Sequence, residues 1–461
     1  MRFPLFFALF GSALLASTFA GCSAGASTSS QPAAGALPVA PAGQARQVSG
    51  TRRTLITATC TGTGTNAFVG GGASNVAGGT DSGVVAGTGN KACDQSTVIG
   101  GGTSNTIAPN SGNPVTNGFI GGGESNAITT FTDGFIGAGS TNTVTGPRGA
   151  IVSGSGNSLA ATDAILASGE GNTISVFGTM GFIGDGSGNS VTNTYGVVMN
   201  GNNNSVSGEY GVIGSGINNT VSGEGGYIAS GGYNTVAGEG AVIVGGFNST
   251  APGNFATIPG GYTNSAAGTY SFAAGARASA ANTGAFVWSD GSDGTAILTS
   301  SQNYQFLARA SGGYTLWTNA ASTVGATLAP GSGTWASASD RNLKTDVAHI
   351  DDDAVLDKVA SLPISRWSYK SEHGVSHVGP MAQDFYAAFK LGEDDKHITS
   401  IDEDGVALAA IKALHAENLT IRGENAQLRH RLAASQTAES VQIAALRQEV
   451  ADLRELVRAH R

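Results

Sequence analysis

The chain has 461 residues, of which 71 are glycine and only 12% are charged, and its formal net charge is -9. A typical globular domain has about 25% charged residues and about 7% glycine, so this composition argues against an ordinary globular enzyme. The acidic balance and the lack of a basic stripe argue against nucleic acid as a partner. Of the 55 charged side chains, 35 lie between Asp340 and Arg461, which places the main domain boundary just before Asp340.

Residues 1–22 have the layout of a secretory signal peptide: one base, an apolar run, and small residues before Cys22. The ending FAGC resembles a bacterial lipobox, in which the cysteine is lipidated after cleavage, although Phe19 stands where leucine is usual. Two alternatives follow: a lipid anchor on Cys22, or plain secretion with an unused cysteine. In both alternatives we expect a secreted or cell-surface protein. If Cys22 is lipidated, the protein is an outer-membrane lipoprotein that contacts the membrane only through this lipid. No later run reaches the roughly 18 apolar residues of a membrane span.

Residues 23–65 begin with an Ala-, Gly-, Ser- and Pro-rich stretch and are predicted to form a flexible tether. The two remaining cysteines, Cys60 and Cys93, are 33 residues apart. In an exported protein they could form a disulfide, but they could equally be buried and free.

A repeat fills residues 66–290, and segments such as FVGGGASNVAGG, FIGGGESNAITT and VIGSGINNTVSG reveal its unit. Each unit has an apolar pair, a glycine-rich turn, and an asparagine two residues before Val or Ile. Seven of the twelve spacings between the marker asparagines are 15 residues. The markers are Asn75, Asn90, Asn105, Asn126, Asn142, Asn157, Asn172, Asn189, Asn204, Asn219, Asn234, Asn248 and Asn264.

A unit of about 15 residues accommodates two strands of four or five residues and two turns, so each unit is predicted to be one coil of a parallel β-solenoid. Stacked coils should align isoleucine on isoleucine and asparagine on asparagine, which makes the asparagines ladder residues rather than ligands. A disordered tract is the alternative, but it would not place bulky apolar residues once per period. The pattern resembles the heads of trimeric autotransporter adhesins, whose β-roll trimerises through its apolar faces. This resemblance implies a homotrimer.

Residues 291–338 alternate apolar and polar residues in short runs divided by Gly and Pro, which predicts a β-rich, intertwined neck.

The next module, residues 339–405, contains SDRNLKTDVAHI, LPISRWSYK and HVGPMAQDFYAAF, followed by GVALAAIKALHAENLTIRGENAQL. These segments, in this order, resemble the self-cleaving intramolecular chaperone domain at the C-terminus of phage tailspikes, endosialidases and some fibre proteins. The resemblance implies that Ser339 is the nucleophile, that Lys344 is the assisting base, and that the chain is cut between Ala338 and Ser339. It implies no cofactor. The acidic runs at 351–353 and 393–395 lack the ligand spacing of an EF-hand, so no metal site is expected.

The chemistry of such a pair is reasonable, since a serine hydroxyl needs a base and a lysine acts as one when burial lowers its pKa. Ser339 and Lys344 are five residues apart, so the segment must turn between them. The alternative is an exposed turn in which Ser339 caps a helix. Asp340, His377 and Gln383 are possible supporting residues. A lone histidine is more often structural, and departures from the family pattern beside Gln383 leave its role open.

Residues 406–461 are predicted to form a helix with coiled-coil character. Its apolar residues follow a 3-4 pattern that resumes after an eleven-residue step, and Asn418 and Asn425 occupy core positions, where asparagine weakens a coiled coil but fixes its register. The seam residues are Ile411, Leu414, Ile421, Leu428, Leu432, Ile443, Leu446, Val450, Leu453 and Val457.

Two classes of function fit this mainly β chain with a C-terminal α+β module. One is a trimeric cell-surface adhesin or tail-fibre-like protein whose module directs folding and then removes itself by autoproteolysis, as a single-turnover serine peptidase. The other is an uncleaved structural fibre with an inactive module. A glycan-degrading tailspike would need paired carboxylates, whereas the acids of the repeat are isolated. For the fibre we expect a surface ligand, a glycan or a host surface, which the sequence does not identify.

Overall fold

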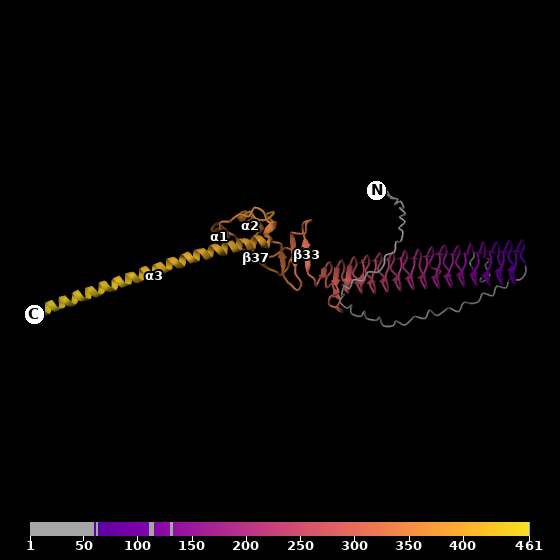
Figure 1. Ribbon diagram of the computed structural model, residues 1–461, viewed down its shortest axis with the longest axis horizontal. Coiled ribbons are helices and arrows are strands. Elements are labelled where there is room, and N and C mark those ends of the chain that lie inside the picture. Colours follow the sequence, from indigo (N-terminus) through magenta and orange to yellow (C-terminus); the bar gives the residue numbers. More distant parts are fainter. Residues whose placement is uncertain (1–59, 61–62, 110–114, 130–131, 461) are drawn as a thin grey trace, which may run out of the picture. The chain divides into compact units, whose positions relative to one another are not determined.

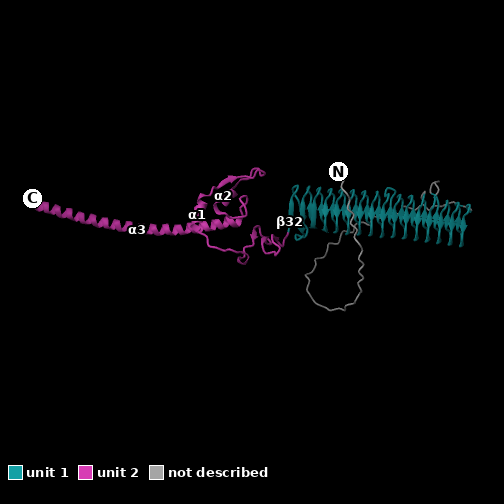
Figure 2. Cartoon of the chain, turned by 90° about the horizontal axis from the view of Figure 1, so that it is seen from above, with its two compact units in different colours: residues 1–309 teal, residues 310–461 magenta. Residues whose placement is uncertain are grey.

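A computed structural model describes residues 60, 63–109, 115–129 and 132–460 (Figure 1). It divides into two compact units, the first ending at Arg309 and the second beginning at Ala310 (Figure 2). The predictions for the signal peptide, for Cys22 and for nearly all of the tether lie outside the described residues.

The first unit is a parallel β-solenoid with two sheets of 17 and 15 short strands. The strands of the first sheet are β1 (Phe68–Val69), β3 (Gly83–Val84), β5 (Val98–Ile99), β7 (Phe119–Ile120), β9 (Phe135–Ile136), β11 (Ala150–Ile151), β13 (Ile165–Leu166), β15 (Phe182–Ile183), β17 (Val197–Val198), β19 (Val212–Ile213), β21 (Tyr227–Ile228), β23 (Val242–Ile243), β25 (Thr257–Ile258), β26 (Gly261–Tyr262), β28 (Phe272–Ala276), β30 (Phe286–Asp290) and β32 (Phe306–Arg309). Those of the second sheet are β2 (Val76–Ala77), β4 (Lys91–Ala92), β6 (Thr106–Ile107), β8 (Ala127–Ile128), β10 (Thr143–Val144), β12 (Ser158–Leu159), β14 (Thr173–Ile174), β16 (Ser190–Val191), β18 (Ser205–Val206), β20 (Thr220–Val221), β22 (Thr235–Val236), β24 (Thr250–Ala251), β27 (Ser265–Ala266), β29 (Ala278–Ala280) and β31 (Leu298–Thr299).

The fold prediction of a mainly β parallel solenoid is therefore confirmed, but most strands have two residues, not four or five. The shorter strands are supplemented by a third pairing position, a series of isolated parallel bridges such as Ser140 with Ser155. Each coil thus touches its neighbours along three lines, and the turns between these lines use the remaining residues.

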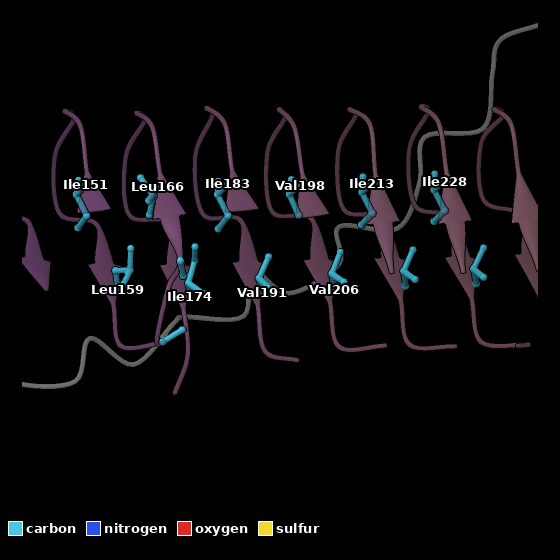
Figure 3. Packing of buried hydrophobic residues seen from close by; sticks show 14 of the residues in the cluster. Ile151, Leu159, Leu166, Ile174, Ile183, Val191, Val198, Val206, Ile213 and Ile228 are labelled. Carbon is cyan, nitrogen blue, oxygen red and sulfur yellow. The ribbon is translucent and has the colours of Figure 1, made fainter. Parts of the chain in front are cut away.

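The core lies between the two sheets and consists mainly of the second residue of the two-residue strands. Figure 3 shows one row with Ile151, Leu166 and Ile183 opposite a second row with Leu159 and Ile174. The parallel register places Ile120 directly beside Ile136, as predicted. These side chains are fully buried within a single chain, so each coil contributes about one apolar side chain per sheet to a core that needs no second copy.

The marker asparagines form a buried ladder. The backbone N–H of Asn157 donates to Oδ1 of Asn142 at 3.1 Å, and Nδ2 of Asn157 donates to the Gly169 carbonyl of the next coil at 2.9 Å. Asn248 is the one wrong assignment: it has a positive φ of 55° in an exposed turn, and the buried ladder position belongs to Ser249. Ser249 accepts the Asn264 N–H at 3.2 Å, so a hydroxyl replaces the amide oxygen in that coil.

Parallel pairing extends beyond residue 290, the predicted end of the solenoid. β30 pairs with β32 in register over four residues, so the parallel ladder reaches Arg309. The neck sequence is consequently divided between the two units, with its first part in the solenoid.

The second unit begins with an antiparallel sheet of β33 (Tyr314–Trp317), β34 (Gly325–Leu328) and β35 (Trp335–Ser337). A 3-10 turn, η1 (Arg341–Leu343), follows, and then α1 (Asp352–Ser361), the hairpin of β36 (Ser365–Trp367) and β37 (His377–Gly379), and α2 (Ala382–Phe389). The unit ends with α3 (Ser400–Ala459), a helix of 60 residues.

α3 begins six residues before the predicted start, because Thr399 caps it and accepts the N–H of Asp402. Asp402 and Glu403 therefore lie inside the first turn, where acidic residues interact favourably with the helix dipole. Near this end Val406, Ala409, Ala410 and Ala413 are buried, and α1 packs against the helix. None of the described helices has the length and apolarity required to cross a membrane.

The ladder gives a stability prediction. Asn219→Ala removes the acceptor of the Asn234 N–H and the Nδ2 donor to the Gly231 carbonyl, so the free energy of unfolding should fall by about 2 kcal/mol or more. Asn248→Gly is the matched control, because Asn248 is exposed and glycine adopts its positive φ freely. Thermal melts of the solenoid would measure both, and equal stability of the two variants would contradict the ladder's role.

Candidate functional site

Ser339 and Lys344 are brought together in the second unit. Nζ of Lys344 donates a hydrogen bond to Oγ of Ser339 at 2.7 Å. The turn that the spacing requires is η1, which reverses the chain between the two residues. A hydrogen-bonded hydroxyl and amine at this separation are the arrangement from which a lysine can accept a serine proton.

Asp340 holds this turn. Its carboxylate accepts the backbone N–H of Asn342 at 2.9 Å and the Asn342 side-chain amide at 3.0 Å. Asp340 is therefore the N-cap of η1. The turn is exposed, as in the alternative, but its cap is Asp340 and not Ser339. Because Asp340 takes the capping position, the Ser339 hydroxyl remains available to Lys344.

The residue before Ser339 is also fixed. Ala338 follows directly after β35, and its N–H donates to the Gly325 carbonyl of β34 at 3.0 Å. Gly325 cannot be replaced easily, since a Cβ there would lie 2.1 Å from the Leu316 carbonyl oxygen. The Ala338–Ser339 peptide bond thus joins a residue held by a sheet to a residue held by a capped turn.

Both members of the pair are exposed to solvent in the single chain. A lysine that acts as general base must spend part of its time neutral, and removal from water is one of the main causes that favour the neutral form. The single chain positions the two groups but does not enclose them.

His377 and Gln383 lie elsewhere in the module. The Nε2 atom of His377 is 2.9 Å from a Glu372 carboxylate oxygen, and its ring packs 4.7 Å from Trp367 and 5.7 Å from Tyr369. Gln383 is exposed in the first turn of α2. None of the hydrogen bonds among the described residues joins His377 or Gln383 to Ser339 or Lys344.

Sequence reasoning missed Gly325 and Glu372. Glu372 precedes His377 by five residues, but nothing in that spacing indicates that a hairpin will place the two side chains together. Gly325 is one glycine among 71, and only the pairing of β34 with β35 reveals its contact with Ala338.

The cysteines that the sequence left open form a disulfide. Cys60 and Cys93 are bonded, with their Cα atoms 5.5 Å apart. Cys93 directly follows β4, so the bond ties the segment before the first coil to the second coil.

The comparisons with known proteins give a family match for this segment. Residues 339–391 match the family model described as the chaperone of endosialidase, Peptidase_S74. The matched segment begins at Ser339 itself and covers η1, α1, the hairpin and α2. No curated protein matches the chain.

Together, the solenoid and the matched segment support a tail-fibre-type structural protein. This chain carries a chaperone-of-endosialidase domain at residues 339–391, near its C-terminus.

The contact of Gly325 gives a testable expectation. Gly325→Ala should separate β34 from its neighbours and lower the stability of this sheet by about 1–3 kcal/mol, the usual effect of overpacking. Gly333→Ala is the control, because no atom lies within 4 Å of the Cβ that it would add. Unfolding followed by the fluorescence of Trp317 and Trp335 should distinguish the two. If Gly325→Ala were as stable as its control, the close packing at Gly325 would be wrong.

Proposed function

We propose that the chain is an exported, trimeric surface fibre whose C-terminal module directs trimer folding and then releases itself by autoproteolysis between Ala338 and Ser339. The observation that carries this proposal is the 2.7 Å hydrogen bond from Lys344 to Ser339 at the first residue of the family match. The family is described as a peptidase and chaperone, and those two words correspond to the two activities proposed.

The reaction conserves atoms in two steps. Lys344 in its neutral form accepts the hydroxyl proton while Oγ of Ser339 attacks the Ala338 carbonyl carbon. Lys344 then returns this proton to the Ser339 nitrogen, which leaves as an amine when the C–N bond breaks. The acyl group has then moved from nitrogen to oxygen, which gives an ester. Water hydrolyses the ester and yields a carboxylate on Ala338 and a free amino terminus on Ser339.

Trimer formation is supported first by α3. Its seam residues remain exposed along most of the helix, and the exposed fractions of Leu414 and Leu428 are 49% and 53%. A stripe of exposed apolar residues along a long helix is typical of a coiled-coil helix seen without its partner helices. The core asparagines Asn418 and Asn425 meanwhile donate to the carbonyls four residues earlier in the same helix.

The rest of the module gives a second support. In the described part of this unit the buried apolar residues are Phe385 and four residues of α3, whereas Leu343, Val347, Ile350 and Ile364 are exposed. A unit with so small a core gains little stability from folding alone. Association would bury these side chains and could enclose the Ser339–Lys344 pair, so that cleavage would follow completed assembly.

The second candidate function is an uncleaved fibre with an inactive module. The exposure of both Ser339 and Lys344 favours it, because a fully hydrated lysine is a poor general base at neutral pH. The two candidates differ in whether the trimer encloses the pair. In either, we propose an extracellular location, with a lipid on Cys22 as the anchor and a glycan or a host surface as the ligand.

Cleavage itself is the test of the first candidate. Ser339→Ala should abolish cleavage and leave the trimer intact, because the exposed hydroxyl contributes little to folding. Lys344→Ala should slow it by about 10²–10⁴-fold, the usual contribution of a general base. Intact mass and N-terminal sequencing of the fragments would measure both. A Ser339→Ala chain that is still cut, or a wild-type trimer that stays whole, would remove the enzymatic candidate.

Assembly is tested separately through the seam of α3. Replacing Ile421 and Leu428 by Asp should prevent the helices from associating, since each copy would place charges in the core. Light scattering should then show loss of the trimer. Replacing Glu424 and Gln427 by Asp is the control, because these residues lie outside the seam. A well-folded wild-type monomer would contradict trimer formation whatever the state of the Ala338–Ser339 bond.

A further inference from the structure

One edge of the solenoid departs from the repeat in three ways within neighbouring coils. The first departure is an insertion: the ladder residues Asn172 and Asn189 are 17 residues apart, not 15. The extra residues push Val176 and Phe177 outward, and the exposed fraction of Phe177 reaches 73%. The core and the ladder do not require this insertion, because both remain intact across it.

The second departure concerns the turn that follows. Met180, Tyr195 and Tyr210 occupy equivalent positions in three successive coils, each with a φ of 56–57°. Glycine, asparagine and aspartate adopt this conformation most readily, and they fill the position in most other coils. The Tyr195 and Tyr210 rings stack at 4.9 Å, yet 51% of Tyr210 is exposed. Bulky side chains therefore stand at strained positions without being buried.

The third departure is a row of like charges. Glu209, Glu224 and Glu239 precede this turn position in consecutive coils, linked by backbone hydrogen bonds such as Gly225 N–H to the Glu209 carbonyl. Among the ion pairs of the described residues, none involves these three carboxylates. Desolvation and the nearby carboxylates of Glu209 and Glu224 raise the pKa of Tyr210. The edge thus combines apolar side chains with uncompensated negative charge.

A gap lies beside Tyr210. In the next coil the turn position is Gly225, where an added Cβ would have only the Gly240 nitrogen near it, at 4.0 Å. The aromatic row resumes at Phe255, whose ring lies over Gly240. One face of the Tyr210 ring is therefore opposite a glycine rather than a third ring, with Glu224 alongside. A cation above an aromatic face and beside a carboxylate is a favourable arrangement.

A second copy of the solenoid does not fit this edge. Residues 63–309 contain twelve acids and four bases, and the bases are Lys91, Arg148, Arg277 and Arg309. In copies aligned in register none of these bases comes from the coils that contain Glu209, Glu224 and Glu239. A membrane surface or a nucleic acid presents anions and would be repelled.

We propose that the edge formed by Phe177, Tyr195, Tyr210, Glu209 and Glu224 binds a polypeptide segment that presents Lys or Arg beside apolar side chains. The gap at Gly225 receives the cationic group, which lies against the free face of Tyr210 and pairs with the carboxylates. Phe177 and Tyr195 contact the apolar residues of the segment. Three unfavourable local choices at one edge are expected where a surface is selected for binding rather than for folding. This proposal does not depend on cleavage at Ser339.

The experiment uses the full chain and a fluorescent ten-residue peptide of alternating Lys and Leu. Fluorescence anisotropy should show binding that weakens with added NaCl, and Glu209→Gln/Glu224→Gln should weaken it by about tenfold. The control variant Glu124→Gln/Glu170→Gln removes the same charge elsewhere on the solenoid and should change the affinity less than twofold. Gly225 has a positive φ of 62°, which asparagine adopts more readily than most other larger residues. Gly225→Asn should therefore fill the gap and also weaken binding.

Three results would overturn the proposal. The first is equal affinity of the wild type and both Gln variants. The second is equal binding of a peptide with Glu in place of Lys. The third is a change in the mass of the assembly when Glu209 and Glu224 are replaced, because the edge would then be a contact between copies.

Discussion

One ladder residue in most coils, an asparagine everywhere except at Ser249, determines the regularity of the solenoid. Each ladder asparagine accepts the N–H of its successor and donates to a glycine carbonyl of the next coil, so a coil cannot shift without leaving buried polar groups unpaired. The ladder bond persists even where Asn105 and Asn126 are 21 residues apart, at 3.0 Å. Insertions are therefore confined to the outer turns, and this explains why departures from the repeat change the surface and not the core.

Much of this architecture could be predicted from the period, because the period specifies both the coil and the register. The error at Asn248 has a chemical cause. Asparagine is suited to the buried ladder and also to a turn with positive φ, and Ser249 supplies enough hydrogen-bonding capacity to take the ladder position beside it. The strands are shorter than the predicted four or five residues because each coil also pairs through an isolated bridge. These bridges have no signature in the sequence.

The site was predictable only where residues lie close in sequence. Ser339, Asp340 and Lys344 share one short turn, so the motif and the need to reverse direction are sufficient to bring them together. The position of the His377 side chain depends on the pairing of β36 with β37. Its contacts with Glu372 and Trp367 follow from that hairpin. No local pattern in the sequence indicates that this hairpin will form and bring these side chains together.

The two units differ in how much of their apolar surface a single chain buries. A single chain of the solenoid buries its apolar core side chains completely. The solenoid therefore does not need to trimerise in order to cover them. Aromatic side chains on the outer face of the first sheet, such as Phe119 and Phe135, remain partly exposed. Association through them would add to a core that is already complete. The described residues of the second unit form no comparable core, so the proposed association would stabilise mainly this unit.

This contrast gives the proposed cleavage a physical consequence. Ala338 and Gly325, which are joined by the hydrogen bond from the Ala338 N–H to the Gly325 carbonyl, both precede the scissile bond. Hydrolysis would therefore leave the hydrogen bonds of the β33, β34 and β35 sheet intact. The released part would contain α3 and therefore the seam that supports association. A fibre that has lost the segment guiding its assembly cannot reassemble by the same route after unfolding, and its persistence becomes a matter of unfolding rate rather than of equilibrium. The proposed cleavage would thus remove the module with the small core and leave the solenoid, whose core a single chain completes.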